Sequence, residues 1–181
     1  YSLAVLALGA TSCKKFLESE SPSSFTDTYI YSNETDATKA VNSIYALFNQ
    51  DAFTSRVSNN FAGNSDIEVG SVNATPSGDR RDIWSFEATP ANRDLLVVWN
   101  NGYNAINRAN ESIEGIQSSA LFKAGNARMQ HLLGEAKGLR AIWYWYLINH
   151  WGDVPLKLTP TKAGDEFYLP RTDRNEVLTT I

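Results

Sequence analysis

The side chains best suited to bind a small polar ligand lie in one long segment without a sustained helical period, residues 51–89. Segments of this length without secondary structure are uncommon inside a compact domain and are usually functional. Sugars are bound when their C–H groups stack on an aromatic face while their hydroxyls meet carboxylate, amide and guanidinium groups. We therefore expect ligand contacts from five residues, with a loop whose polar groups serve only its own backbone as the alternative: Asn64, Asp66, Arg80, Arg81 and Trp84.

Groups that could carry catalysis or hold a metal are few. A glycosidase needs two carboxyl groups about 5 to 10 Å apart across a cleft, and candidates such as Asp165 with Glu166 are neighbours in a loop. His131 and Glu135 lie four residues apart on an expected helix, but two ligands without a third are a weak metal signal. The sequence has no serine nucleophile elbow, phosphate-binding loop or redox cysteine pair. We expect no catalytic residue, no metal and no cofactor.

Composition and charge favour one helical domain with a core. The chain has 181 residues, 43% of them hydrophobic, and a formal net charge of -4. Acidic and basic residues are interleaved, and the longest basic runs are Lys14-Lys15 and Arg80-Arg81, so we expect no nucleic-acid partner. The chain begins without Met and stops at Ile181 inside an amphipathic pattern. We expect it to be a fragment.

The amino-terminal residues have the features of an export signal. Residues 1–12 are apolar and rich in small side chains, too short to span a bilayer, and typical of the hydrophobic part of a signal peptide. Cys13, the only cysteine, follows directly and resembles a bacterial lipidation site, although Ala10 stands where Leu is common. We expect a signal remnant over 1–12 and a lipidated tether over 13–31. The alternative is a short buried helix with an incidental cysteine.

Three long helices are predicted by apolar residues at spacings of three and four. The first follows cap-type residues 32–36 and has its stripe at Ala37, Ala40, Val41, Ile44, Leu47 and Phe48. The second follows a cap at Thr89-Pro90, and its stripe is Leu96, Trp99, Tyr103, Ile106, Asn110, Ile113 and Gln117. The third follows a break at 124–126, and its stripe is Leu132, Ala136, Leu139, Trp143, Tyr146 or Leu147, and His150.

Shorter elements complete this prediction. Short strands are expected near 67–69 and 83–86, inside the long loop. Gly152 and Pro155 should stop the third helix, and Thr172-Asp173 should cap a fourth. Gly138, inside the third helix, is expected to mark close packing.

Aromatic and charged residues on these helices are expected to be structural. Four consecutive helical residues, 143–146, point in directions about 100° apart and cannot form one stacking face, so core packing is predicted for them. Trp99 and Tyr103 lie on the apolar stripe of the second helix, so we expect both to be in the core. Buried Glu135 and Arg140 would each need a partner. Asn107 and Asn110 are expected to tie their helix to a loop.

One continuous segment carries a resemblance to a known family. Residues 134–141 read Gly-Glu-Ala-Lys-Gly-Leu-Arg-Ala, and residues 151–155 read Trp-Gly-Asp-Val-Pro. The two together resemble the Gly-Glu-Ala-x-x-Leu-Arg-Ala helix and Trp-Gly-x-x-Pro stop of the SusD/RagB family of Bacteroidetes outer-membrane lipoproteins. Residues 40–45, the spacing of Trp99 and Tyr103 before Ala109-Asn110, and residues 169–171 are also similar to family motifs.

The resemblance implies a fold and a function. It implies a mostly α fold of tetratricopeptide-like helix-turn-helix pairs with long irregular loops, in which 32–181 form a truncated amino-terminal helical domain. It further implies a lipoprotein anchored at Cys13 in the outer membrane and facing the exterior. Such a protein is expected to capture oligosaccharide or polysaccharide without bond chemistry and deliver it to a SusC-like TonB-dependent transporter. The alternative is a helical-repeat scaffold that binds a protein and no glycan.

Overall fold

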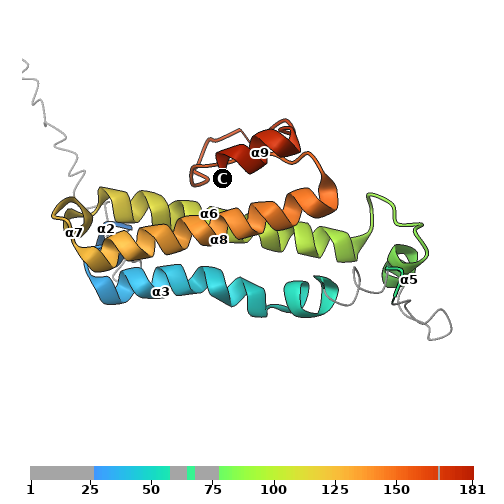
Figure 1. Cartoon of the computed structure of the whole chain (residues 1–181), viewed down its shortest axis with the longest axis horizontal. Helices are drawn as coiled ribbons and strands as arrows, with labels where there is room; N and C mark the ends of the chain where they lie inside the picture. The colour runs from blue at the N-terminus through green and yellow to red at the C-terminus, as the bar shows by residue number, and fades with distance from the viewer. Residues whose placement is uncertain (1–26, 58–64, 68–77, 167) are drawn as a thin grey trace, which may run out of the picture.

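Three long helices form the body of the molecule, as a computed structural model of residues 27–57, 65–67, 78–166 and 168–181 shows (Figure 1). They are α3 (Glu34–Tyr45), α6 (Arg93–Ser118) and α8 (Ala127–Trp151). Figure 1 shows α6 and α8 side by side and antiparallel, with α3 packed along them. Over the described ranges no strand forms beyond a single antiparallel bridge between Val154 and Thr172. The predicted mostly α class is confirmed.

Short elements link and cover the long helices. They are α2 (Asp27–Ile30), the 3-10 turn η1 (Ala46–Asn49), the π-helical η2 (Ala52–Val57), α5 (Gly78–Trp84), α7 (Ala120–Lys123) and α9 (Arg174–Thr180). In Figure 1, α7 joins α6 to α8 at one end of the bundle, and α5 lies at the other end, beyond the start of α6. The loop after α8 and the following α9 lie over the α6–α8 pair. None of the helices in the described ranges is long and apolar enough to cross a membrane.

The long helices begin where side chains cap them. The amide oxygens of Asn33, Asn92 and Asn126 accept hydrogen bonds from the first-turn backbone of α3, α6 and α8. Such caps satisfy backbone donors that have no partner inside the helix. The predicted start at Thr89-Pro90 is wrong, because the Asn92 side chain accepts from Leu95 N and fixes the start of α6 three residues later.

The helix ends also follow local chemistry. Gly152 ends α8 with φ +70°, a left-handed conformation that favours glycine. Asp173 caps α9 through hydrogen bonds from Asn175 N and Glu176 N, as predicted. The strand expected over 83–86 is wrong: Ile83 is a buried residue of α5, which is held to the start of α6 by Asn92 Nδ2 donating to Asp79 O at 2.7 Å. Residues 68–69 lie outside the described residues.

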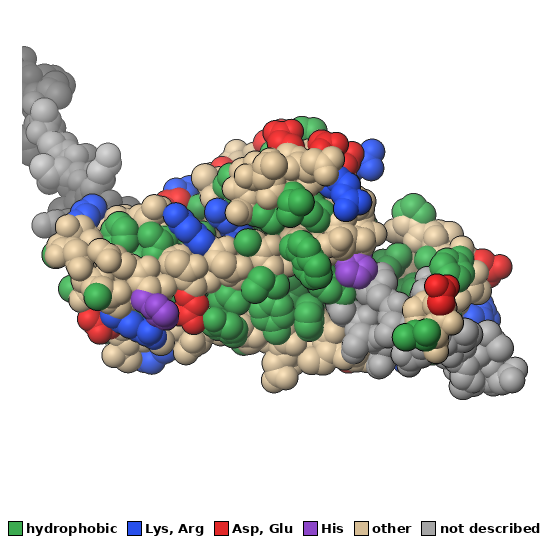
Figure 2. Space-filling view, in the orientation of Figure 1, with side chains coloured by type: hydrophobic (Ala, Val, Ile, Leu, Met, Phe, Trp, Pro, Cys, Tyr) green, Lys and Arg blue, Asp and Glu red, His purple; other side chains and the backbone are tan. Residues whose placement is uncertain are grey.

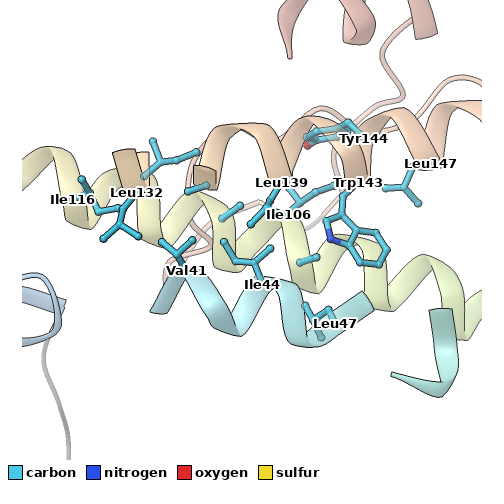
Figure 3. Packing of buried hydrophobic residues seen from close by; sticks show 14 of the residues in the cluster. Val41, Ile44, Leu47, Ile106, Ile116, Leu132, Leu139, Trp143, Tyr144 and Leu147 are labelled. Atoms are coloured by element: carbon cyan, nitrogen blue, oxygen red, sulfur yellow. The ribbon is translucent and has the colours of Figure 1, made fainter. Parts of the chain in front are cut away.

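Apolar side chains from all three long helices meet in one core (Figure 3). Trp143 is 1% exposed and stacks on Phe48 with ring centroids 4.5 Å apart. Tyr144, on the other side of α8, is fully buried. Core packing is therefore confirmed for these two of the four aromatic residues at 143–146. It is wrong for Trp145, which is 55% exposed.

The predicted stripes are wrong at three end positions: Leu96, Gln117 and His150 are exposed. On α6 the buried band is wider than one stripe, because this helix packs against both α3 and α8. Its buried residues include Val98, Gly102, Ala105, Ile106, Ala109, Asn110, Ser112, Ile113, Gly115 and Ile116. The two long helices thus cover two sides of α6, and η2 and α5 also contact it.

Two glycines have opposite surroundings. A Cβ added at Gly115 of α6 would lie 2.0 Å from the Tyr31 ring, whereas one added at Gly138 of α8 would meet nothing within 4 Å. Tyr31 is 4% exposed and donates from its hydroxyl to Ser112 Oγ at 3.4 Å. Gly115 is therefore the residue that allows close approach. The close packing expected at Gly138 is wrong, since that position faces open space.

Candidate functional site

The residues predicted to bind a ligand are placed in different surroundings. Asn64 and Cys13 lie outside the described residues. Asp66 lies in an exposed bend of residues 65–67, while Arg80, Arg81 and Trp84 are on α5. The structure thus groups the last three on one short helix.

Arg80 takes part in an ion pair network between three elements. Its Nε lies 3.9 Å from Oδ2 of Asp94, at the start of α6, and Arg56 of η2 contacts the other carboxylate oxygen. Asp94 is only 5% exposed, so two guanidinium groups balance a charge that would be costly to bury alone. Arg81 is exposed and lies 3.4 Å from Asp82. Arg80 therefore has a structural partner that sequence reasoning did not assign.

A concave surface lies away from α5, between α6 and the loop that follows α8. We call it the aromatic hollow. It has a volume of about 540 Å³, within the usual range for small-ligand sites. Its lining residues come from α6 and from the loop: Trp99, Tyr103, Pro155, Lys157, Thr161, Glu166, Tyr168, Leu169 and Pro170.

The α6 wall of the aromatic hollow consists of Trp99 and Tyr103. Their rings lie 4.9 Å apart, and Trp99 also packs edge-on against Trp151 at 5.5 Å. The Tyr103 hydroxyl donates to Pro155 O at 2.8 Å. Burial raises the pKa of Tyr103 far above its usual value, so this donor stays protonated. Both residues were predicted to be core; they are partly buried, and they pack and line the hollow at once.

The opposite wall is held in place by polar side chains of the helices. Asn110, 1% exposed, donates to Lys157 O at 3.0 Å and to Thr159 O at 3.1 Å. Arg140 Nη1 donates to Asn110 Oδ1 at 2.8 Å and to Leu158 O at 3.3 Å. The predictions that Asn110 ties helix to loop and that Arg140 has a structural partner are confirmed.

Tyr144 adds a two-way contact to the same loop. Its hydroxyl donates to Lys157 O at 2.9 Å and accepts from Lys157 N at 2.7 Å. Burial raises its pKa to about 12, so the proton needed for this contact stays in place at neutral pH. Asn107 Oδ1 accepts from Thr161 N at 2.8 Å, which confirms the second predicted tie. The loop wall is thus fixed to both α6 and α8.

Polar groups inside the hollow are already partly engaged with one another. Lys157 Nζ donates to Thr161 Oγ1 at 2.9 Å and lies 3.2 Å from Asp165 Oδ2. Glu166 Oε1 accepts from Tyr168 N at 3.0 Å. The Tyr168 ring is 91% exposed. The site therefore combines aromatic faces with a few oriented hydrogen-bonding groups, which is the general pattern of a small-ligand site.

Asp165, beside the hollow, does not have the properties of a general acid. Hydrogen bonding from Lys162 N, followed by that from Lys157, holds the pKa of Asp165 below its usual value. A glycosidase acid requires the opposite shift. On α8, His131 Nε2 lies 3.9 Å from Glu135 Oε2, and the Glu135 carboxylate accepts from the Tyr45 hydroxyl at 2.8 Å. The described part of the chain has no group of three side chains suited to a metal.

A second, more apolar hollow adjoins the first. It has a volume of about 480 Å³ and includes Trp99, Trp151, Leu95, Leu96 and Pro90 in its lining. Trp99 borders both hollows. Leu96, which its stripe predicted to be buried, is exposed and lines this second hollow.

Sequence reasoning missed the loop wall of the aromatic hollow. Residues 156–170 carry no helical or strand period, so nothing local indicates that they lie against Trp99, more than 50 residues earlier. One signal did point to a loop contact, and the predicted ties of Asn107 and Asn110 rest on it: Asn110 is a polar residue in the buried stripe of α6, and a buried polar side chain needs a partner. Their partners are the backbone groups of this loop.

Comparisons with known proteins all point to one family. The family described as SusD-like, starch-binding and associating with the outer membrane, matches residues 15–181. One SusD-like protein of Formosa agariphila is 22% identical over 97% of this chain and 34% of its own length, and another is 29% identical over the same shares. The chain therefore spans about a third of the length of these relatives.

Solved structures share the fold. A SusD superfamily protein from Bacteroides vulgatus superposes with a TM-score of 0.73 at 18% identity, over 83% of this chain and 32% of that one. A SusD-like carbohydrate binding protein from Bacteroides fragilis gives a TM-score of 0.60 at 19% identity, over 83% and 30%.

Proposed function

The chain belongs to the SusD-like family, and on that premise we propose that it captures oligosaccharide at the outer membrane and delivers it to a SusC-like TonB-dependent transporter. The observation that carries the binding part is the aromatic hollow, in which the rings of Trp99, Tyr103 and Tyr168 accompany Lys157 and Glu166. Aromatic faces stack on sugar C–H groups, and ionised groups form strong hydrogen bonds with hydroxyls. The protein binds and releases its ligand without cleaving it.

The predicted loop residues remain part of this proposal as a second contact region. Arg81 and Trp84 are the candidates on α5, and Asp66 is exposed nearby in the sequence. Arg80 would act through its contact with Asp94 rather than as a free guanidinium. Asn64 belongs to the same proposed set.

Binding should depend on the aromatic rings of the hollow. Tyr168→Ala is expected to weaken glycan binding about tenfold in the full-length protein, the loss that follows from removing one stacking ring. Because Tyr168 is 91% exposed, its removal leaves the core intact. Affinity gel electrophoresis against starch and a panel of other polysaccharides measures this effect.

Trp145→Ala is the matched control, because Trp145 is an exposed aromatic residue of α8 that does not line the hollow. It should leave glycan affinity unchanged. If Tyr168→Ala and Trp145→Ala bind every polysaccharide as the parent protein does, the hollow is not the binding site.

A protein-binding scaffold is the second candidate, and one observation favours it. Figure 2 shows hydrophobic side chains gathered over the middle of one face of the bundle, and Ile142 and Trp145 of α8 are 49% and 55% exposed. A scaffold would bind no glycan and would lose its protein partner in Trp145→Ala. The same two variants therefore separate the candidates.

Anchoring at Cys13 completes the proposal, with residues 1–12 as signal remnant, 13–31 as tether and 32–181 as helical domain. Acyl chains on a single cysteine hold a protein firmly only when there are two or more. In cells fed a labelled fatty acid, the protein should incorporate label, and Cys13→Ser should remove it and release the protein from the membrane fraction. Unlabelled parent protein in the membrane fraction would refute the anchor. Protease treatment of intact cells then tests the outward orientation.

A further inference from the structure

The charges of the aromatic hollow carry an inference about which saccharides it accepts. We propose that the hollow selects uncharged saccharides and rejects chains that carry carboxylate or sulfate groups. This inference rests on the proposed glycan binding and specifies its ligand class.

Only two of the nine lining residues are charged, Lys157 and Glu166. The Lys157 ammonium is 3.2 Å from the Asp165 carboxylate and donates to Thr161 Oγ1, and its side chain is 20% exposed. Its positive charge is therefore already compensated. Glu166, the other charged lining residue, forms no ion pair within the described part of the chain, so the charge that the hollow leaves uncompensated is a carboxylate.

Other cations of the loop wall have partners of their own. Lys162 Nζ lies 2.6 Å from Glu114 Oε1. Arg140 Nη1 donates to Asn110 and to the carbonyl of Leu158. An anionic sugar entering the hollow would thus have to break the ion pair of Lys157 or Lys162, or the hydrogen bonds that Arg140 donates to Asn110 and the loop, to gain a cation.

The physical consequence differs for the two classes of sugar. A carboxylate or sulfate loses hydration on entering and meets like charges, a repulsion strengthened beside the low-dielectric walls of Trp99 and Tyr103. A neutral sugar meets carboxylate oxygens that act as acceptors for its hydroxyl donors, while its C–H faces meet the rings. The same groups therefore favour one class and oppose the other.

Paired polysaccharides that differ in charge on one backbone test this inference on the full-length protein. Suitable pairs are hydroxyethyl starch with carboxymethyl starch, hydroxyethyl cellulose with carboxymethyl cellulose, and arabinoxylan with glucuronoxylan. For each pair whose binding is weakened by Tyr168→Ala, the neutral polysaccharide should bind about tenfold more tightly than the acidic one at low salt. Raising the salt concentration should reduce the difference.

A charge reversal inside the hollow provides the matched test. Glu166→Lys should tighten binding of the acidic member about tenfold. Glu34→Lys makes the same change in net charge at the first turn of α3, at the other end of the bundle from the start of α6 (Figure 1), and should leave both affinities unchanged.

The outcomes separate this inference from the proposed function. If the acidic members bind as tightly as the neutral members in a manner that depends on Tyr168, the inference is overturned and glycan binding stands. Equal effects of Glu166→Lys and Glu34→Lys overturn it as well, because the hollow would then not set the selectivity. If no polysaccharide binds in a manner that depends on Tyr168, the proposed function fails and the inference fails with it.

Discussion

Replacing Asn110 with alanine is expected to lower the free energy of unfolding by about 2 to 4 kcal/mol. This side chain is 1% exposed and makes three hydrogen bonds: it donates to Lys157 O and Thr159 O, and it accepts from Arg140 Nη1. Alanine removes all three hydrogen bonds: Thr159 O loses the donor described here, while Lys157 O keeps the Tyr144 hydroxyl and Arg140 keeps Leu158 O. A buried group left unsatisfied costs more than a hydrogen bond contributes. Urea denaturation measures the change.

Asn104→Ala is the control for this prediction, because Asn104 is an exposed residue of the same helix. It should raise stability by a few tenths of a kcal/mol through helix propensity alone. Limited proteolysis gives a second readout, since Asn110→Ala should expose residues 156–161 to cleavage before the helices unfold. Equal stability of the Asn110 and Asn104 variants would show that the side chain does not hold the loop.

The second large effect is expected at Gly115. Gly115→Ala should lower the free energy of unfolding by about 1 to 3 kcal/mol, because the new Cβ would lie 2.0 Å from a ring carbon of buried Tyr31. Gly138→Ala should do the opposite and raise stability by about 1 kcal/mol, since α8 gains a better helix former in open space. The same substitution therefore has opposite signs on two neighbouring helices.

A double variant identifies the cause. In a Tyr31→Ala background the ring is absent, so Gly115→Ala should become stabilising by helix propensity. Thermal unfolding of the four proteins of this cycle gives the interaction energy. A Gly115→Ala penalty that persists without the Tyr31 ring would place the clash elsewhere.

Much of the fold is predictable from the sequence because the relevant signals are local. The spacing of Val41 with Ile44 and of Leu132 with Ala136 predicts the buried sides of α3 and α8, and both pairs are buried. The left-handed end of α8 at Gly152 follows from glycine chemistry. The start of α6 was missed because a tertiary contact decides it: Asn92 caps the helix while its amide also holds Asp79 of α5.

The candidate site was less predictable, for a physical reason. The aromatic hollow has two walls, and the helical spacing in the sequence indicates only the wall on α6. Trp99 and Tyr103 have the spacing of core residues, and half of their role is indeed packing. The wall formed by Lys157, Glu166 and their neighbours depends on hydrogen bonds from distant helices, and no local pattern of residues encodes such contacts.

The single bridge between Val154 and Thr172 brings together the two ends of the intervening loop. Its first half is attached to α6 and α8 by Asn110 and Tyr144, which are buried, and by more exposed contacts of Thr161 and Lys162 with α6. Residues 163–170 follow these attachments in the sequence. This second half can change in length and side chains while both anchor points stay where they are. Under the proposed glycan binding, the sequence of this stretch and the helical frame can diversify separately. Exchanging the stretch between relatives would then alter glycan preference while the helices stay unchanged.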